Sequence, residues 1–124
     1  MNDAVALRSI GQIAVPVTDI ERAVGFYRDT LGMRLLFQAP PSLAFFDLDG
    51  VRLMLDGPAA AHAGTGSVIY YNVDDIDAAF ESLSARGVSF ERKPHLVAKL
   101  PDHDLWMAFL RDPDGNLLAL MATR

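Results

Sequence analysis

The chain has 124 residues, of which 51% are hydrophobic and 22% are charged, a size and composition typical of one globular domain. Its net charge of -5 argues against a nucleic-acid backbone as a partner, and because it lacks an apolar run of about 18 residues, no membrane partner is expected. It contains no cysteine, which excludes disulfides and thiolate metal sites, and a cytoplasmic protein is expected.

The first half of the chain predicts a strand, a helix and three further strands. The apolar, β-branched stretch "IGQIAVPV" at 10–17 is typical of a strand. Thr18 and Glu21 fit a capping box at the start of a helix, and Gly32 can adopt the left-handed conformation that ends it. The apolar face of this helix is expected to hold Ile20, Ala23, Val24, Tyr27 and Leu31. The remaining strands are expected at 33–38, 43–48 and 51–55.

The second half predicts the same order of elements after a small-residue linker at 58–66. The stretch "VIYYNV" at 68–73 is typical of a strand. Asp74 or Asp75 then caps a helix, which Gly87 ends. The apolar face of this helix is expected to hold Ile76, Ala79, Phe80 and Leu83. The remaining strands are expected at 88–91, 104–111 and 116–121.

The two halves also repeat each other in sequence. The stretch "VTDI" at 17–20 matches "VDDI" at 73–76, and the hairpin turn "DG" at 49–50 matches "DG" at 114–115. Two matches in the same order indicate a duplicated supersecondary unit. One such unit leaves a sheet face bare, so we expect the two copies to pack into one domain.

We therefore predict a single α+β domain, 1–124, built from two βαβββ modules. Module one is expected at about 8–57, and module two at about 67–122. The two modules are expected to form a curled, mixed β-sheet that lines a cleft, with the helices outside.

This order of elements, the stretch "VTDIERAVGFYRDTLGM" and the "DPDGN" hairpin together resemble the vicinal oxygen chelate superfamily. That group includes glyoxalase I, extradiol dioxygenases, methylmalonyl-CoA epimerase and the bleomycin-resistance proteins. The resemblance covers about 10–121 and implies a small-molecule cleft and a homodimer. It does not choose an activity, because this fold hosts lyases, isomerases, oxygenases and metal-free drug binders.

The resemblance also implies where a metal would be held, on the first and last strand of each half. The corresponding positions here are Gln12, Met54, Val68 and Ala119. Only Gln12 can offer an oxygen, whereas a divalent catalytic ion needs about three ligands of the His or carboxylate type. We therefore expect neither a metal nor another cofactor, which argues against glyoxalase, epimerase and dioxygenase activity.

Strand alternation places further apolar and aromatic side chains on the same faces as these four positions. Such a lining is typical of a small-molecule pocket, and it is also typical of a packed core. The cleft of the resembled superfamily favours the pocket. The candidate ligand-binding residues on these strands are Gln12, Arg52, Met54, Val68, Tyr70, Met107, Phe109 and Ala119.

The segment "ERKPHLVAKLPDHDLWM" at 91–107 is too long for a plain hairpin, and we expect a loop. Its His95 and His103 either contact a ligand from a lid or lie in a solvated loop. Strand parity places Trp106 on the face opposite Met107 and Phe109, which favours a packing role.

Two functions follow from the sequence. The first is a metal-free protein that binds or sequesters a small aromatic or amphipathic molecule. The second is an enzyme of the superfamily that uses a displaced metal site or acid–base chemistry by His95 or His103.

Overall fold

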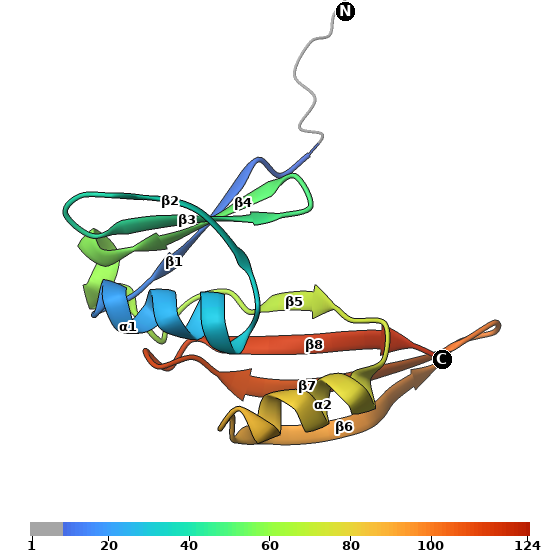
Figure 1. Ribbon diagram of the computed structural model, residues 1–124. Helices are drawn as coiled ribbons and strands as arrows, with labels where there is room; N and C mark the ends of the chain where they lie inside the picture. The colour runs from blue at the N-terminus through green and yellow to red at the C-terminus, as the bar shows by residue number, and fades with distance from the viewer. Residues whose placement is uncertain (1–8) are drawn as a thin grey trace, which may run out of the picture.

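The computed structural model describes residues 9–124 and contains two four-stranded mixed β-sheets, each with an α-helix (Figure 1). The expected α+β fold of two βαβββ modules is confirmed. The first module consists of β1 (Gln12–Pro16), α1 (Ile20–Gly25) with its π-helical continuation η1 (Phe26–Thr30), β2 (Arg34–Ala39), β3 (Leu43–Leu48) and β4 (Val51–Asp56). After the 3-10 helix η2 (Gly57–His62), the second consists of β5 (Ile69–Asn72), α2 (Ile76–Ala85), β6 (Phe90–Lys99), β7 (Asp104–Arg111) and β8 (Leu117–Thr123).

The strand order is the same in both sheets, β1-β4-β3-β2 in the first and β5-β8-β7-β6 in the second. In each sheet the first strand runs parallel to the last one, and the other neighbours are antiparallel. Strands β1 and β5 are edge strands, so the two sheets remain separate and do not share a hydrogen-bonded ladder. This common topology agrees with the sequence repeat.

Each α-helix begins after an aspartate whose side chain satisfies a backbone N–H of the first turn. Asp75 accepts a hydrogen bond from Ala78 N at 3.0 Å at the start of α2, as one of the two sequence alternatives predicted. At the start of α1 the cap is Asp19, which accepts from Arg22 N at 3.2 Å. The capping box predicted at Thr18 is therefore wrong, because the Thr18 side chain bonds to the second module instead.

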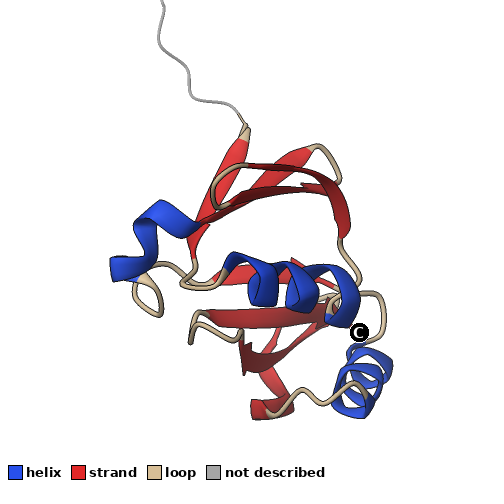
Figure 2. Ribbon diagram, turned by 60° about the vertical axis from the view of Figure 1, so that its left-hand side comes forward, coloured by secondary structure: helices blue, strands red, loops and turns tan. Residues whose placement is uncertain are grey.

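Both modules contribute to one hydrophobic core. Figures 1 and 2 show that α1 lies between the two sheets, and α2 packs on the second sheet. The fully buried side chains include Tyr27 of η1, Leu53 of β4 and Leu110 of β7. None of the helices within residues 9–124 has the length and apolar character that crossing a membrane would require.

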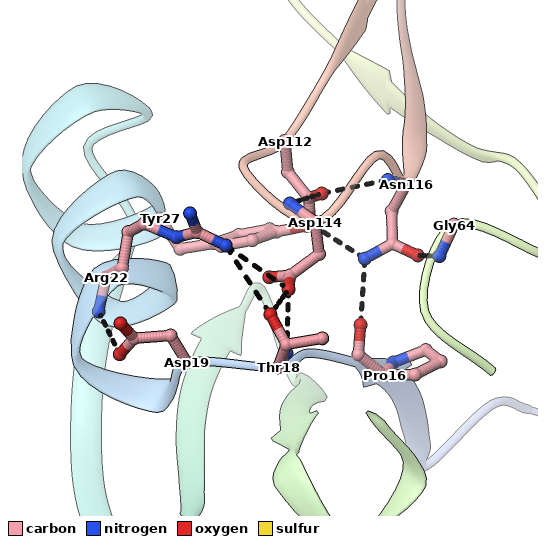
Figure 3. Close-up of polar contacts among 9 residues, drawn as sticks. All are labelled: Pro16, Thr18, Asp19, Arg22, Tyr27, Gly64, Asp112, Asp114 and Asn116. Carbon is pink, nitrogen blue, oxygen red and sulfur yellow. Dashed lines mark hydrogen bonds and ion pairs between the residues drawn. The ribbon is translucent and has the colours of Figure 1, made fainter. Parts of the chain in front are cut away.

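The turn between β7 and β8 fastens the second module to the first (Figure 3). Asp112 is 5% exposed, and its carboxylate accepts a hydrogen bond from the Tyr27 hydroxyl at 2.9 Å. The Asn116 amide nitrogen donates to the same carboxylate and to Pro16 O, both at 2.9 Å, while its oxygen accepts from Gly64 N at 2.9 Å. Asn116 thereby joins the turn, β1 and the linker.

Asp114 of the same turn makes a second connection to the first module. Its Oδ1 accepts hydrogen bonds from the backbone N–H of Thr18, at 2.7 Å, and from the Thr18 hydroxyl. The Arg22 guanidinium lies 3.6 Å from the same oxygen, and the Asp114 side chain is fully buried. The "DPDGN" turn therefore connects the two modules in addition to forming a hairpin.

Candidate functional site

One face of the first sheet carries the candidate residues of the first module. On β4, Leu53 and Leu55 are buried in the core, so Arg52 and Met54 point to the opposite face. Gln12 of β1 stands opposite Arg52 in the register, and its amide nitrogen lies 3.8 Å from the Met54 sulfur. The structure therefore brings Gln12, Arg52 and Met54 together on one surface.

Two phenylalanines extend this surface. Phe37 of β2 and Phe45 of β3 stack with their ring centroids 4.6 Å apart. The Arg52 guanidinium lies 5.9 Å from the Phe37 centroid and 5.5 Å from the Phe45 centroid, within the range of a cation–π interaction. The carboxylate of Asp47, opposite Arg52 in the register, lies 4.0 Å from the Arg34 guanidinium instead. We call this surface, with Gln12 and Met54, the Arg52 face.

Sequence reasoning missed both phenylalanines. The signal was the pair "FF" at 45–46, because strand alternation sends only one of two neighbouring side chains into the core. Phe46 is the one that is fully buried in that core, which leaves Phe45 on the Arg52 face.

The corresponding face of the second sheet is aromatic and centred on Ala119. The Ala119 side chain is 0% exposed although it lies outside the shared hydrophobic core. In the register it stands between Tyr70 of β5 and Phe109 of β7, whose ring centroids are 6.2 Å apart in an edge-to-face arrangement. Two rings therefore flank the position at which the resemblance implied a metal ligand.

His95 borders the same face. It stands opposite Met107 in the register, and its ring stacks on Phe109 with centroids 6.1 Å apart. Its Nδ1 lies 2.7 Å from Lys93 O. Because a carbonyl oxygen only accepts, Nδ1 carries the proton in the neutral ring and Nε2 is left as an acceptor. We call the surface of Tyr70, His95, Met107, Phe109 and Ala119 the Phe109 face.

The long loop predicted at 91–107 is wrong. Strand β6 continues to Lys99 and β7 begins at Asp104, so only a short turn at 100–103 connects them. The strand pattern was hidden because the pairing register shifts three times along β6 and because Pro94 interrupts it. An edge strand such as β6 tolerates a proline, since its outer N–H positions need no partner strand.

This correction separates the two candidate histidines. His95 lies on the sheet, whereas His103 lies in the turn with its Nδ1 2.7 Å from Asp102 Oδ1. Trp106 packs against the hydrophobic core, as strand parity predicted, and the Arg124 guanidinium lies 4.3 Å from its ring centroid.

The residues at the implied metal positions do not fit a divalent ion. Met54 offers a thioether, Val68 just before β5 and Ala119 offer hydrocarbon, and the Gln12 amide is the single oxygen donor. Within residues 9–124 no group of three or more His, Asp or Glu side chains is placed to hold a metal. Divalent catalytic ions need about three such ligands, so these residues cannot hold one for catalysis.

The Arg52 face and the Phe109 face lie on separate sheets, each on the side away from the shared core. Among residues 9–124 no hydrogen bond, ring contact or cation–π contact joins the residues of one face to those of the other. One chain therefore presents two distinct aromatic surfaces.

Paired βαβββ modules with an open face on each sheet are the architecture of the vicinal oxygen chelate class of proteins. The chain belongs to the Glyoxalase/Bleomycin resistance protein/Dioxygenase superfamily, which it matches over residues 9–120.

The proteins that this chain resembles include an antibiotic-binding protein and a lyase. The protein YraH of Bacillus subtilis is 27% identical over 126 aligned residues, which cover 88% of this chain and 94% of YraH. The crystal structure of TnmS3, an antibiotic-binding protein from Streptomyces sp. CB03234, has a TM-score of 0.74 and 27% identity and covers 98% of this chain and 100% of its own. The structure of lactoylglutathione lyase from Agrobacterium tumefaciens has a TM-score of 0.77 at 22% identity, and the match covers 94% of this chain and 95% of that one. This match shows a likeness of fold.

Proposed function

We propose that the protein binds a small aromatic or amphipathic molecule on the Arg52 face and the Phe109 face without a metal ion. The observation that carries this proposal is the exposed Arg52 guanidinium over the Phe37 and Phe45 rings. A planar ligand with an acidic group could stack on such rings and pair with the guanidinium. The likeness to TnmS3, an antibiotic-binding protein, supports binding as the function.

We further propose a homodimer in which the Arg52 face of one protomer covers the Phe109 face of its partner. Phe37 and Tyr70 are each 46% exposed in the single chain, so both faces have apolar surface to bury. A twofold axis would then form two equal clefts from the four faces. Light scattering at micromolar concentration should give a dimer mass, and a monomer mass would contradict this arrangement.

Methionine methyl groups provide the test of ligand binding. Met54, Met107 and Met121 lie outside the shared core, on the faces of their sheets that carry the candidate residues. With 13C-methyl methionine, 1-naphthoate should shift the signals of these residues. Arg52→Gln should weaken its binding roughly tenfold, the loss of a charge-assisted contact, whereas the exposed Arg28→Gln should not. Naphthoate that shifts none of the three signals at millimolar concentration would contradict the proposal.

Catalysis is a second candidate function, and the Nε2 acceptor of His95, which has no hydrogen-bond partner within residues 9–124, favours it. In this alternative, His95 removes a proton from a bound carbonyl compound as a general base. The test is the exchange of the methylene protons of phenylpyruvate in D2O, followed by NMR. Exchange above the buffer rate that is lost in His95→Gln and kept in His103→Gln would establish this activity, and an unaccelerated rate would reject it for this substrate.

A further inference from the structure

A separate cavity of about 330 Å³ lies on the helix side of the second sheet, between the two modules. The first module contributes the segment that follows η1 and the end of β3, and the second contributes α2 and the inner faces of β5, β7 and β8. The apolar side chains that line it include Leu31, Met33, Leu48, Ala79, Leu83 and Leu120. This volume exceeds by far the ~30 Å³ of one water molecule, and an apolar lining offers water few hydrogen bonds.

Two polar side chains with unused hydrogen-bonding capacity also line this cavity. The Tyr71 hydroxyl is buried and has no hydrogen-bond partner within residues 9–124. The Arg86 guanidinium donates to Thr30 O at 2.8 Å with Nη1, and in the described part of the chain no carboxylate lies within 4.0 Å of it. Arginine carries five N–H donors, so most of those on Arg86 remain available.

The cavity is distinct from the Phe109 face, because successive residues of a strand point to opposite sides. Tyr70 of β5 contacts Phe109 on one side of the sheet, whereas Tyr71 lies on the core side. Arg86 follows α2 and lies on neither of the two candidate faces.

We propose that this inter-module cavity is a second ligand site, which takes a small aliphatic carboxylate. The hydrocarbon chain fills the space between the modules, and the carboxylate pairs with the Arg86 guanidinium at the end of α2. Since Leu31, Met33 and Leu48 belong to the first module, an occupied cavity also couples the two modules.

Octanoate is the probe that tests this site, with octanol as the uncharged control. The chain contains five methionines, of which Met33 lines the cavity while Met54, Met107 and Met121 belong to the opposite sheet faces. In 13C-methyl spectra octanoate should shift Met33 and leave those three unchanged. Shifts confined to those three, or no shift at millimolar concentration, would overturn the proposal. Because naphthoate binding is read from different methionines, either proposed site can fail without the other.

Variants separate the contribution of the charge from that of the cavity. Arg86→Gln should weaken octanoate binding roughly tenfold and leave octanol binding unchanged, as expected for one charge-assisted contact. Ala79→Phe fills the cavity and should abolish binding of both, whereas Ala78→Phe on the exposed neighbouring position should bind as the wild type does. If Ala79→Phe does not fold, Ser82→Phe on the exposed rim serves instead. Wild-type octanoate affinity in the cavity-filling variant would reject the site.

Discussion

Ala119 shows how one small side chain shapes the Phe109 face. It is fully buried between Tyr70 and Phe109, so a larger residue would have to push the two rings apart. We expect Ala119→Glu to lower the free energy of unfolding by ~2–4 kcal/mol, through overpacking and an unpaired buried carboxylate. Urea denaturation measures this loss. Thr123→Glu, on the same side of β8 but exposed, should change stability by less than ~0.5 kcal/mol. Equal stability of the two variants would contradict the expected burial.

Gln12 offers the corresponding prediction for metal ions. Mg²⁺ and Mn²⁺ prefer carboxylates and Zn²⁺ prefers imidazole or thiolate, so one amide oxygen beside Met54 should not retain an ion against water. An ion bound at a hundred times its dissociation constant would stabilise the protein by ~2.7 kcal/mol. We expect Mn²⁺, Ni²⁺, Zn²⁺ and Fe²⁺ to leave the melting temperature unchanged. A rise with any of them that Gln12→Ala abolishes would show a metal site on the Arg52 face.

The two copies of the "DxDG" turn, at 47–50 and 112–115, differ in the hydrogen bonds that their first aspartate accepts. In the second turn, the Asp112 side chain accepts hydrogen bonds from the Tyr27 hydroxyl, the Asn116 amide and two backbone N–H groups. In the first turn, Asp47 at the same position accepts from Gly50 N at 3.2 Å. Asp112→Ala leaves several buried donors without an acceptor and should lower the free energy of unfolding by ~2–4 kcal/mol. Asp47→Ala is the matched control and should lower it by less than ~1 kcal/mol, also measured by denaturation. Similar losses in both variants would refute the fastening role of the second turn.

The elements also show where sequence patterns were sufficient. The order of strands and helices along the chain, both α-helices and the Asp49-Gly50 hairpin followed from local signals. Asp49 and Gly50 have positive φ angles of 50° and 95°. The strand expected at 88–91 was predicted too short, because the bulges of β6 destroy the period of two on which strand prediction depends. Thr18 was misread because its partner, Asp114, is remote in the sequence.

Sequence alternation did assign Gln12, Met54, Tyr70 and Phe109 to sheet faces, which needs only the local strand pattern. It could not show that these four residues belong to two surfaces without contacts between them, because that depends on how α1 and the "DPDGN" turn pack the modules together. The Arg52–Phe37–Phe45 stack was missed for a related reason, since the pairing of β2 with β3 sets it.

For the whole molecule, the buried tyrosines predict how stability depends on alkaline pH. Burial, followed by the charge of Asp112, raises the pKa of both Tyr27 and Tyr71 well above the ordinary value near 10. Above that pH the unfolded chain loses these protons while the native protein keeps them. The stabilisation is therefore fully present below pH ~10 and decreases by ~1.4 kcal/mol per pH unit for each tyrosine above it.

Denaturation between neutral pH and pH 11 measures this slope. Tyr71→Phe should remove the contribution of one tyrosine from it, and because the Tyr71 hydroxyl has no hydrogen-bond partner in residues 9–124, stability at neutral pH should not fall through a lost hydrogen bond. Identical slopes for Tyr71→Phe and the wild type would show that Tyr71 ionises freely in the native protein.

The difference between the two "DxDG" turns has an evolutionary consequence. The turn between β7 and β8 holds the two halves together, so its sequence is constrained by residues in both of them. The turn at Asp49 and Gly50 is exposed at the surface, and its Gly50 N–H donates to Asp47 of the same hairpin. Insertions, tags and lineage-specific extensions should therefore accumulate between β3 and β4 and be excluded between β7 and β8, although both hairpins began as copies of the same sequence.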